Sequence, residues 1–189
     1  VLELAPKAVA LDPNNADAHV ILGYVHVFSG SGNLVSGREH YERALTLNPN
    51  HADAWLFLAD LEVLEGNPQV AVNTGKKAFQ LNPHPPPYFE WLMSWILLAA
   101  KRYEEVIDLF GNEEPQAIGS KRNFAAALAQ LGRVEEAHVI SRHFMQDVPQ
   151  FTIKNWLNTL PFLKTENQKH IIEGYIKAGF PFDVGDTKS

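Results

Sequence analysis

The chain has 189 residues, of which 46% are hydrophobic and 20% are charged, a composition typical of a globular protein. Its net charge of -6 leaves no basic surplus to neutralise phosphates, which argues against a nucleic-acid partner for the chain as a whole. The absence of cysteine excludes disulfides, zinc–thiolate sites and cysteine nucleophiles, and it is compatible with a reducing compartment, so we expect a cytoplasmic protein.

The chain repeats itself with a period close to 34 residues. Residues 47–55 read LNPNHADAW, and residues 11–19 read almost the same, LDPNNADAH. Prolines recur at intervals of 36, 34, 32 and 34 residues, at Pro13, Pro49, Pro83, Pro115 and Pro149. A period of this length predicts an array of stacked structural repeats rather than a single unrepeated core.

Residues 1–13 are expected to form only the second helix of a repeat, because Ala5 and Ala8 precede Pro13 without a helix before them. We therefore expect the chain to have been cut from a longer protein. Residues 14–149 are expected to hold four helix–turn–helix repeats. At the first two of the recurring turns, proline ends one helix, Asn15 or Asn50 is expected to cap the next, and Asp17 or Asp53 lies in the first turn, where the helix dipole favours negative charge.

The second of these repeats shows the pattern most clearly. One stripe of residues recurs at helical steps, the turn Gly66–Asn67–Pro68 interrupts it, and a stripe of small residues follows. Small residues let two antiparallel helices approach closely, so each pair is expected to pack on itself and to offer its outer faces to the next pair. The two stripes consist of Trp55, Leu58, Ala59 and Glu62, and of Ala71, Gly75 and Ala78.

The third repeat is irregular. It has no glycine at its turn, and its second helix is expected to end early, at the sequence FGNEEP that ends in Pro115. Before it stands HPPPYF, residues 84–89, which reads either as a polyproline recognition motif or as a helix start with Pro87 in the first turn. We favour the helix start, where proline loses no hydrogen bond.

After Pro149 the period is lost. Residues 150–182 are expected to form two further helices that cap the last apolar face of the array. The second begins at a capping box from Thr165 to Gln168 and ends at Gly179 and Pro181. Residues 183–189 are expected to be a disordered tail. The longest apolar run, residues 91–100, is about half of the roughly 20 residues that cross a bilayer, so we expect no membrane span.

The repeats resemble the tetratricopeptide repeat family. The family pattern of large residue, leucine, small residue, turn glycine, alanines and proline falls in the second repeat on the two stripes above, with Gly66 and Pro83. Glu62 and Gly75 depart from it, since the family prefers aromatic residues there. The first and fourth copies supply His19, Leu22, Gly23, His26, Gly30, Tyr41, Ala44 and Pro49, and Phe124, Ala125, Leu128, Gly132, Ala137 and Pro149. The resemblance implies an all-α, right-handed solenoid of helix–turn–helix repeats with a C-terminal helical cap.

The resemblance also implies a function, the binding of a protein or peptide partner in a concave groove lined by the first helix of each repeat. By that mapping the groove residues are Val20, Tyr24, Leu56, Asp60, Tyr88, Trp91, Trp95 and Arg122. Exposed tryptophan and tyrosine are favoured contact residues, and Arg122 could pair with a ligand carboxylate. The alternative is that Trp91 and Trp95, one helical turn apart, fill the core. The lysines and asparagines with which chaperone-binding repeats clamp a carboxylate are absent.

The C-terminal sequence EGYIKAGFP is similar to the ending of bacterial proteins in which such repeats follow a class III adenylate or guanylate cyclase domain. No metal or nucleotide residues of a cyclase can be placed in this chain. The resemblance therefore implies a second reading, a cis-regulatory segment that packs on an attached N-terminal domain of a bacterial cyclase or transcriptional regulator. A third is self-association as a homodimer.

No residues predict catalysis, a metal or a cofactor. His138 and His143 are five apart, so they point about 140° apart on a helix, and no HExxH motif is present. The glycine-rich stretch SGSGNLVSG, residues 29–37, lacks the ending of a phosphate loop and falls at a turn of the repeat. We therefore expect no enzymatic activity, and we expect His19 and His26 to be packed in the repeat core.

Overall fold

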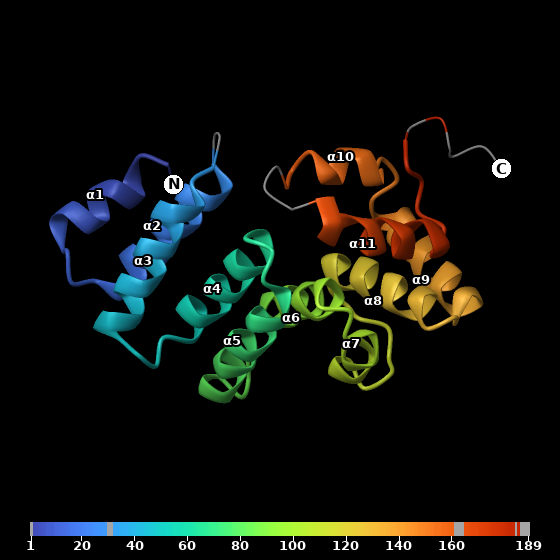
Figure 1. Ribbon diagram of the computed structural model, residues 1–189, viewed down its shortest axis with the longest axis horizontal. Coiled ribbons are helices and arrows are strands. Elements are labelled where there is room, and N and C mark those ends of the chain that lie inside the picture. The colour runs from blue at the N-terminus through green and yellow to red at the C-terminus, as the bar shows by residue number, and fades with distance from the viewer. Residues whose placement is uncertain (1, 30–31, 161–164, 184, 186–189) are drawn as a thin grey trace. The chain divides into compact units, whose positions relative to one another are not determined.

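The computed structural model describes residues 2–29, 32–160, 165–183 and 185, with side chains given for all of these except residues 165–168. Within this part of the chain there are eleven helices and no strand (Figure 1). The predicted all-α class is therefore confirmed. The helices group into two compact units, Val1–Pro85 and Pro86–Ser189.

Unit 1 consists of five helices: α1 (Leu4–Leu11), α2 (Ala16–Phe28), α3 (Leu34–Leu47), α4 (Ala52–Leu64) and α5 (Pro68–Leu81). α2 packs on α3 and α4 packs on α5, and α3 also contacts α4. Small residues make these contacts close, as the repeat pattern predicts: Ala44, Ala54, Ala71 and Ala78 have no exposed surface, and Gly23 lies against the ring of Tyr41.

The helix starts of unit 1 follow the recurring turn. The Asn15 side chain accepts a hydrogen bond from the Ala18 amide at 2.9 Å, as expected for the cap of α2. The expectation that Asn50 caps α4 was wrong. α4 begins one residue later, and His51 is its cap, with Nδ1 accepting from the Ala54 amide at 3.4 Å. Gly66 ends the turn between α4 and α5 with a φ of 90°, a conformation that favours glycine.

The two departures from the family pattern, Glu62 and Gly75, are both buried in unit 1. Burial raises the pKa of Glu62, while a hydrogen bond from Thr74 and the positive charge of Arg38 lower it in part. At this position the family prefers an aromatic ring, whereas the Glu62 carboxyl group loses its hydration when the chain folds, which disfavours its charged form.

Unit 2 consists of six helices: α6 (Pro87–Ala99), α7 (Tyr103–Leu109), α8 (Ile118–Gln130), α9 (Val134–Asp147), α10 (Ile153–Leu157) and α11 (Thr165–Lys177). α6 packs on α7 and α8, and α8 packs on α9. Pro87 lies in the first turn of α6, as predicted. α7 has only seven residues, which agrees with the early end expected for the third repeat.

The C-terminal helix α11 packs on α8 and contacts α6. The chain after it returns to α10, where the Ile153 amide donates to the Pro181 carbonyl at 3.0 Å. Gly179 ends α11 with a φ of 86°, as expected. The predicted capping box depends on the side chains of Thr165 and Gln168, which lie outside the described part of the chain. Most of the predicted disordered tail, residues 183–189, also lies outside it.

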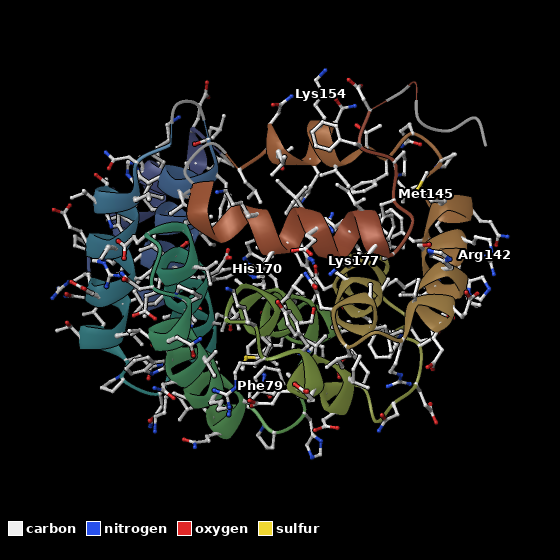
Figure 2. The ribbon with its side chains drawn as sticks, turned by 45° about the vertical axis from the view of Figure 1, so that its right-hand side comes forward. Phe79, Arg142, Met145, Lys154, His170 and Lys177 are labelled. Carbon is white, nitrogen blue, oxygen red and sulfur yellow. The ribbon has the colours of Figure 1, made fainter. Side chains whose placement is uncertain are left out.

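His170 joins α11 to the end of α6. Its ring nitrogen Nε2 donates to the Leu98 carbonyl at 3.0 Å, and no hydrogen-bond partner of Nδ1 is found among the described residues. Figure 2 shows His170 on the side of α11 that faces the other helices of unit 2. Burial lowers the pKa of His170, the nearby charge of Lys101 lowers it further, and the Leu98 hydrogen bond and Glu173 raise it in part. The neutral ring is therefore the form that fits the fold.

We expect acid to destabilise unit 2 through His170. Because its folded pKa lies below the ordinary value of 6.5, the unfolded chain takes up a proton first as the pH falls through that value, and the free energy of unfolding decreases. Urea unfolding at pH 7.5 and pH 5.5 should show a larger loss for the natural chain than for His170→Gln, whose side-chain amide still donates but does not titrate. Equal losses in the two proteins would contradict this assignment.

Candidate functional site

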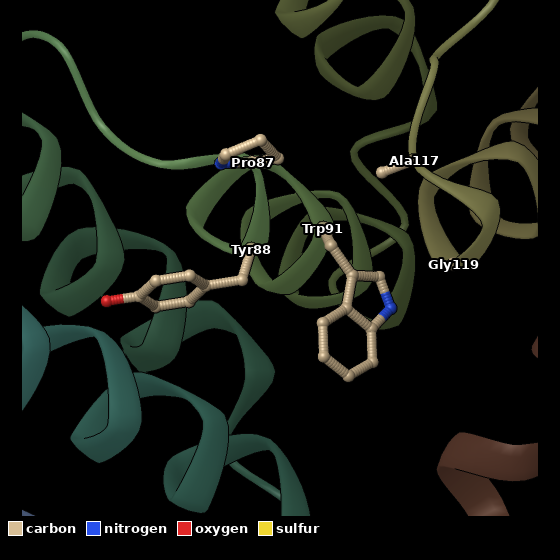
Figure 3. A pocket seen from close by; sticks show the side chains of 5 residues that line it. All are labelled: Pro87, Tyr88, Trp91, Ala117 and Gly119. Atoms are coloured by element: carbon tan, nitrogen blue, oxygen red, sulfur yellow. The ribbon is translucent and has the colours of Figure 1, made fainter.

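A hollow of about 310 Å³ opens on unit 2 where the start of α6 meets the start of α8. Its lining consists of Pro87, Tyr88, Trp91, Ala117 and Gly119 (Figure 3). Pro87 and Tyr88 lie four and three residues before Trp91, so each is about one helical turn from it and the three side chains border the same side of α6. The lining is apolar apart from the tyrosine hydroxyl and the indole nitrogen.

The two tryptophans of α6 have different environments, although both were predicted to line a groove. Trp91 is 39% exposed and Trp95 only 6%. The Trp95 ring meets the edge of Trp156 on α10, with ring centroids 5.8 Å apart. Trp91 therefore reaches the surface of unit 2, whereas Trp95 belongs to its interior.

Trp91 rests against the backbone of α8. A Cβ atom placed on Gly119 would lie 2.5 Å from the indole nitrogen, so the ring occupies the space that a side chain at this position would need. Figure 3 shows the nitrogen-bearing edge of the ring on the side of α8. No hydrogen bond of the Trp91 indole N–H is found within the described part of the chain.

A chain of buried hydrogen bonds holds the backbone under Trp91. The Ser94 hydroxyl donates to the Trp91 carbonyl at 2.7 Å, Asn123 Nδ2 donates to Ser94 Oγ at 3.0 Å, and the Tyr175 hydroxyl donates to Asn123 Oδ1 at 3.0 Å. Ser94, Asn123 and Tyr175 have no exposed surface. The network connects α6, α8 and α11 and holds the backbone carbonyl of Trp91.

Arg122 lies inside this arrangement rather than at an open surface. Its Nε donates to the Tyr175 hydroxyl at 3.1 Å, and its guanidinium carbon lies 4.9 Å from the centre of the Trp156 ring. Phe151 and Tyr175 complete an aromatic surround at 5.5 and 5.6 Å. These contacts give Arg122 a structural role, which is to hold α8 to the C-terminal helices.

The predicted groove residues of unit 1 divide in a similar way. Val20, Leu56 and Asp60 are buried, with 5%, 0% and 5% of their surface exposed, and so are packed in the interior of this structure. Tyr24 is 45% exposed, with its ring 4.8 Å from that of Phe28 and 5.6 Å from that of Phe57. Together with Ile21, which the sequence analysis did not single out, Tyr24 and Phe28 form an exposed apolar stripe on α2.

Three histidines of unit 1 are packed together, and two of them are His19 and His26, which were expected to be packed in the repeat core. His19 and His40 approach to 2.9 Å between their Nδ1 atoms, and the rings of His26 and His40 are stacked with centroids 5.3 Å apart. Burial and the two neighbouring histidines lower the pKa of His40. Among the described residues no group of three or more histidine, aspartate or glutamate side chains has an arrangement that could hold a metal ion.

Three residues of the hollow were missed by the sequence analysis: Pro87 as a lining residue, Ala117 and Gly119. Little in the sequence indicated Gly119, because a glycine in the first turn of an expected helix does not by itself point to a binding site. Only the position of Trp91 across the interface between α6 and α8 gives Gly119 its role.

Comparisons with known proteins agree with this architecture. The family model described as tetratricopeptide repeat matches residues 25–84. The fold is similar to the crystal structure of YrrB, a TPR protein with an unusual peptide-binding site, with a TM-score of 0.61 and 17% sequence identity over 94% of this chain and 92% of that one. The family match supports the tetratricopeptide repeat resemblance for residues 25–84, and the structural similarity shows the fold alone. The predicted solenoid of helical repeats is thereby confirmed as the fold.

The tetratricopeptide repeat assignment concerns the helical repeats and not the C-terminal sequence. The family match ends at residue 84, directly after the second repeat, and neither match involves a cyclase. No curated protein matches the chain. No helix in the described residues is long and apolar enough to cross a membrane.

Proposed function

We propose that this protein is a protein-interaction module that binds a peptide segment of its partner at the hollow of unit 2. The observation that carries this proposal is the exposure of Trp91 on α6, where the buried Ser94 hydroxyl holds the Trp91 backbone carbonyl. Tryptophan and tyrosine dominate binding energy at protein interfaces because each buries a large area while losing little side-chain entropy. A solvent-facing tryptophan over a fixed backbone is therefore suited to recognition.

Two features of the fold support the proposal. Helical-repeat arrays present extended surfaces made of successive first helices, and α6 and α8 are the first helices of their repeats. The structurally similar YrrB is described as having a peptide-binding site. The hollow lies where α6 and α8 adjoin, so one ligand can contact two repeats there.

Selection of peptides from a random library against the immobilised chain tests the proposal. We expect selected peptides to bind Trp91→Ala at least about tenfold more weakly, since truncation of a central aromatic contact typically costs about 2 kcal/mol. Val139→Ala is the matched control, because Val139 is 40% exposed on α9 of the same unit. Peptides that bind all three proteins equally would show that the hollow is not the site.

Two other functions remain as alternatives and give different results in the same experiment. A cis-regulatory segment would select no free peptide and would bind only its attached domain. Self-association is favoured by the exposed leucines Leu2, Leu4 and Leu11 near and on α1, and it would raise the sedimentation mass with concentration. That increase would be unaffected by Trp91→Ala.

A further inference from the structure

The hollow combines features that suit one class of peptide. Pro87 and the Tyr88 and Trp91 rings give an apolar surface, and the indole N–H of Trp91, for which no partner is found among the described residues, is a hydrogen-bond donor beside it. A polyproline II segment has no internal hydrogen bonds, so its carbonyl groups stay free to accept, and its flat pyrrolidine rings pack on aromatic side chains. Such a segment is already extended and loses little entropy on binding.

Two carboxylates near the start of α6 and before α8 have no ion-pair partner among the described residues. Glu90 is the only charged residue of α6 and lies one helical step from Pro87, and no ion-pair partner of Glu90 is found among the described residues. Glu113, in the segment that leads to Ala117, is exposed and likewise has no ion pair in the described part of the chain.

The positive charges of α8 near the hollow are already engaged. Lys121 Nζ lies 3.3 Å from Glu114 and 3.3 Å from Asp147, so its charge is balanced by two carboxylates. The Arg122 guanidinium lies against the aromatic rings around Tyr175. Glu90 therefore lies one helical step from the lining residue Pro87 without an ion pair among the described residues, and a basic residue in a ligand at the hollow would complement its charge.

We infer that the hollow binds a proline-rich segment of a partner protein in the polyproline II conformation, with an arginine or lysine next to its prolines. The prolines pack on Tyr88 and Trp91, the Trp91 indole N–H donates to a peptide carbonyl, and the basic side chain lies toward Glu90. This inference rests on the proposed function, because it names the ligand class of the same site.

The probes are three short synthetic peptides: a proline-rich peptide with one arginine, the same peptide with alanine in place of every proline, and the same peptide with glutamate in place of arginine. Binding to the full chain is followed by calorimetry and tryptophan fluorescence. We expect the first peptide to bind at least tenfold more tightly than either of the others, and added salt to weaken it. Equal binding of the alanine peptide would overturn the inference.

Variants of the chain separate the contributions. Trp91→Ala should reduce affinity for the proline-rich peptide at least tenfold, and Trp91→Phe, which keeps a ring but removes the N–H donor, should reduce it less. Glu90→Gln should weaken only the arginine-containing peptide, whereas Glu135→Gln, which removes an exposed carboxylate on α9, should change nothing. An unchanged affinity for Glu90→Gln would exclude the basic contact.

The outcome also distinguishes this inference from the proposed function. If the library yields peptides that depend on Trp91 but contain no proline, the inference is wrong and the proposed function stands. If no peptide depends on Trp91, both are wrong. Circular dichroism of each variant verifies that the helices remain folded, which is expected because Trp91 and Glu90 are not core residues.

Discussion

Replacing Tyr175 with alanine is expected to lower the free energy of unfolding of unit 2 by about 3–5 kcal/mol, as for other large aromatic residues in a core. Tyr175 has no exposed surface, and its ring lies at the centre of an aromatic cluster, 5.0 Å from the ring of Trp156 and 5.7 Å from that of Phe180. Alanine would leave a cavity between α8, α10 and α11. Arg122 would also lose one face of its aromatic surround.

Tyr175→Phe isolates the contribution of the hydroxyl. Burial raises the pKa of Tyr175, although Arg122 lowers it in part, so the group stays protonated and donates to Asn123. Without the hydroxyl, the fully buried Asn123 loses a donor and Arg122 Nε loses its acceptor. We expect a loss of about 1–3 kcal/mol, the usual cost of leaving buried polar groups unpaired.

Urea unfolding followed by tryptophan fluorescence measures both effects, because three of the four tryptophans, Trp91, Trp95 and Trp156, belong to unit 2 and only Trp55 belongs to unit 1. Tyr24→Ala is the control, since Tyr24 is 45% exposed in unit 1 and its loss should leave the transition reported by these tryptophans unchanged. If Tyr175→Ala unfolded at the same urea concentration as the natural chain, the packing of α11 on α8 would not be an important source of stability.

The repeat period predicted most of the fold because it depends on local physical chemistry. Proline cannot continue a helix, asparagine caps one, and small residues allow close packing wherever they recur. The sequence predicts the first residue of a helix only to within one position. Asn50 and His51 can each accept the capping hydrogen bond, and in the folded chain His51 does so.

Exposure of the candidate site residues could not be predicted in the same way. Trp91 and Trp95 are chemically identical and one helical turn apart, but α10 covers only the second, through Trp156. The role of Arg122 also depends on residues far along the chain, because its guanidinium contacts Phe151, which precedes α10, and Tyr175 on α11. Such contacts depend on tertiary packing outside the repeat, where the period carries no information.

The same substitution at two glycines is expected to have opposite effects. In Gly23→Ala, the new Cβ would lie 2.7 Å from the Tyr41 ring and 3.1 Å from the Gly37 carbonyl. Tyr41 is 1% exposed, so its ring has no room to move. We expect this overpacking to reduce the free energy of unfolding of unit 1 by about 1–3 kcal/mol.

In Gly119→Ala, the new Cβ would instead lie 2.5 Å from the indole nitrogen of Trp91, and this ring is 39% exposed and can turn outward. Alanine also restricts the unfolded chain, which favours the folded state by about 0.4–1 kcal/mol. Stability should therefore be kept or raised, while the displaced ring should shift the tryptophan fluorescence and weaken any peptide bound at the hollow. Urea unfolding and peptide titration of the two variants measure both effects. A destabilised Gly119→Ala with unchanged peptide affinity would show that Trp91 belongs to the packing of unit 2 and not to its binding surface.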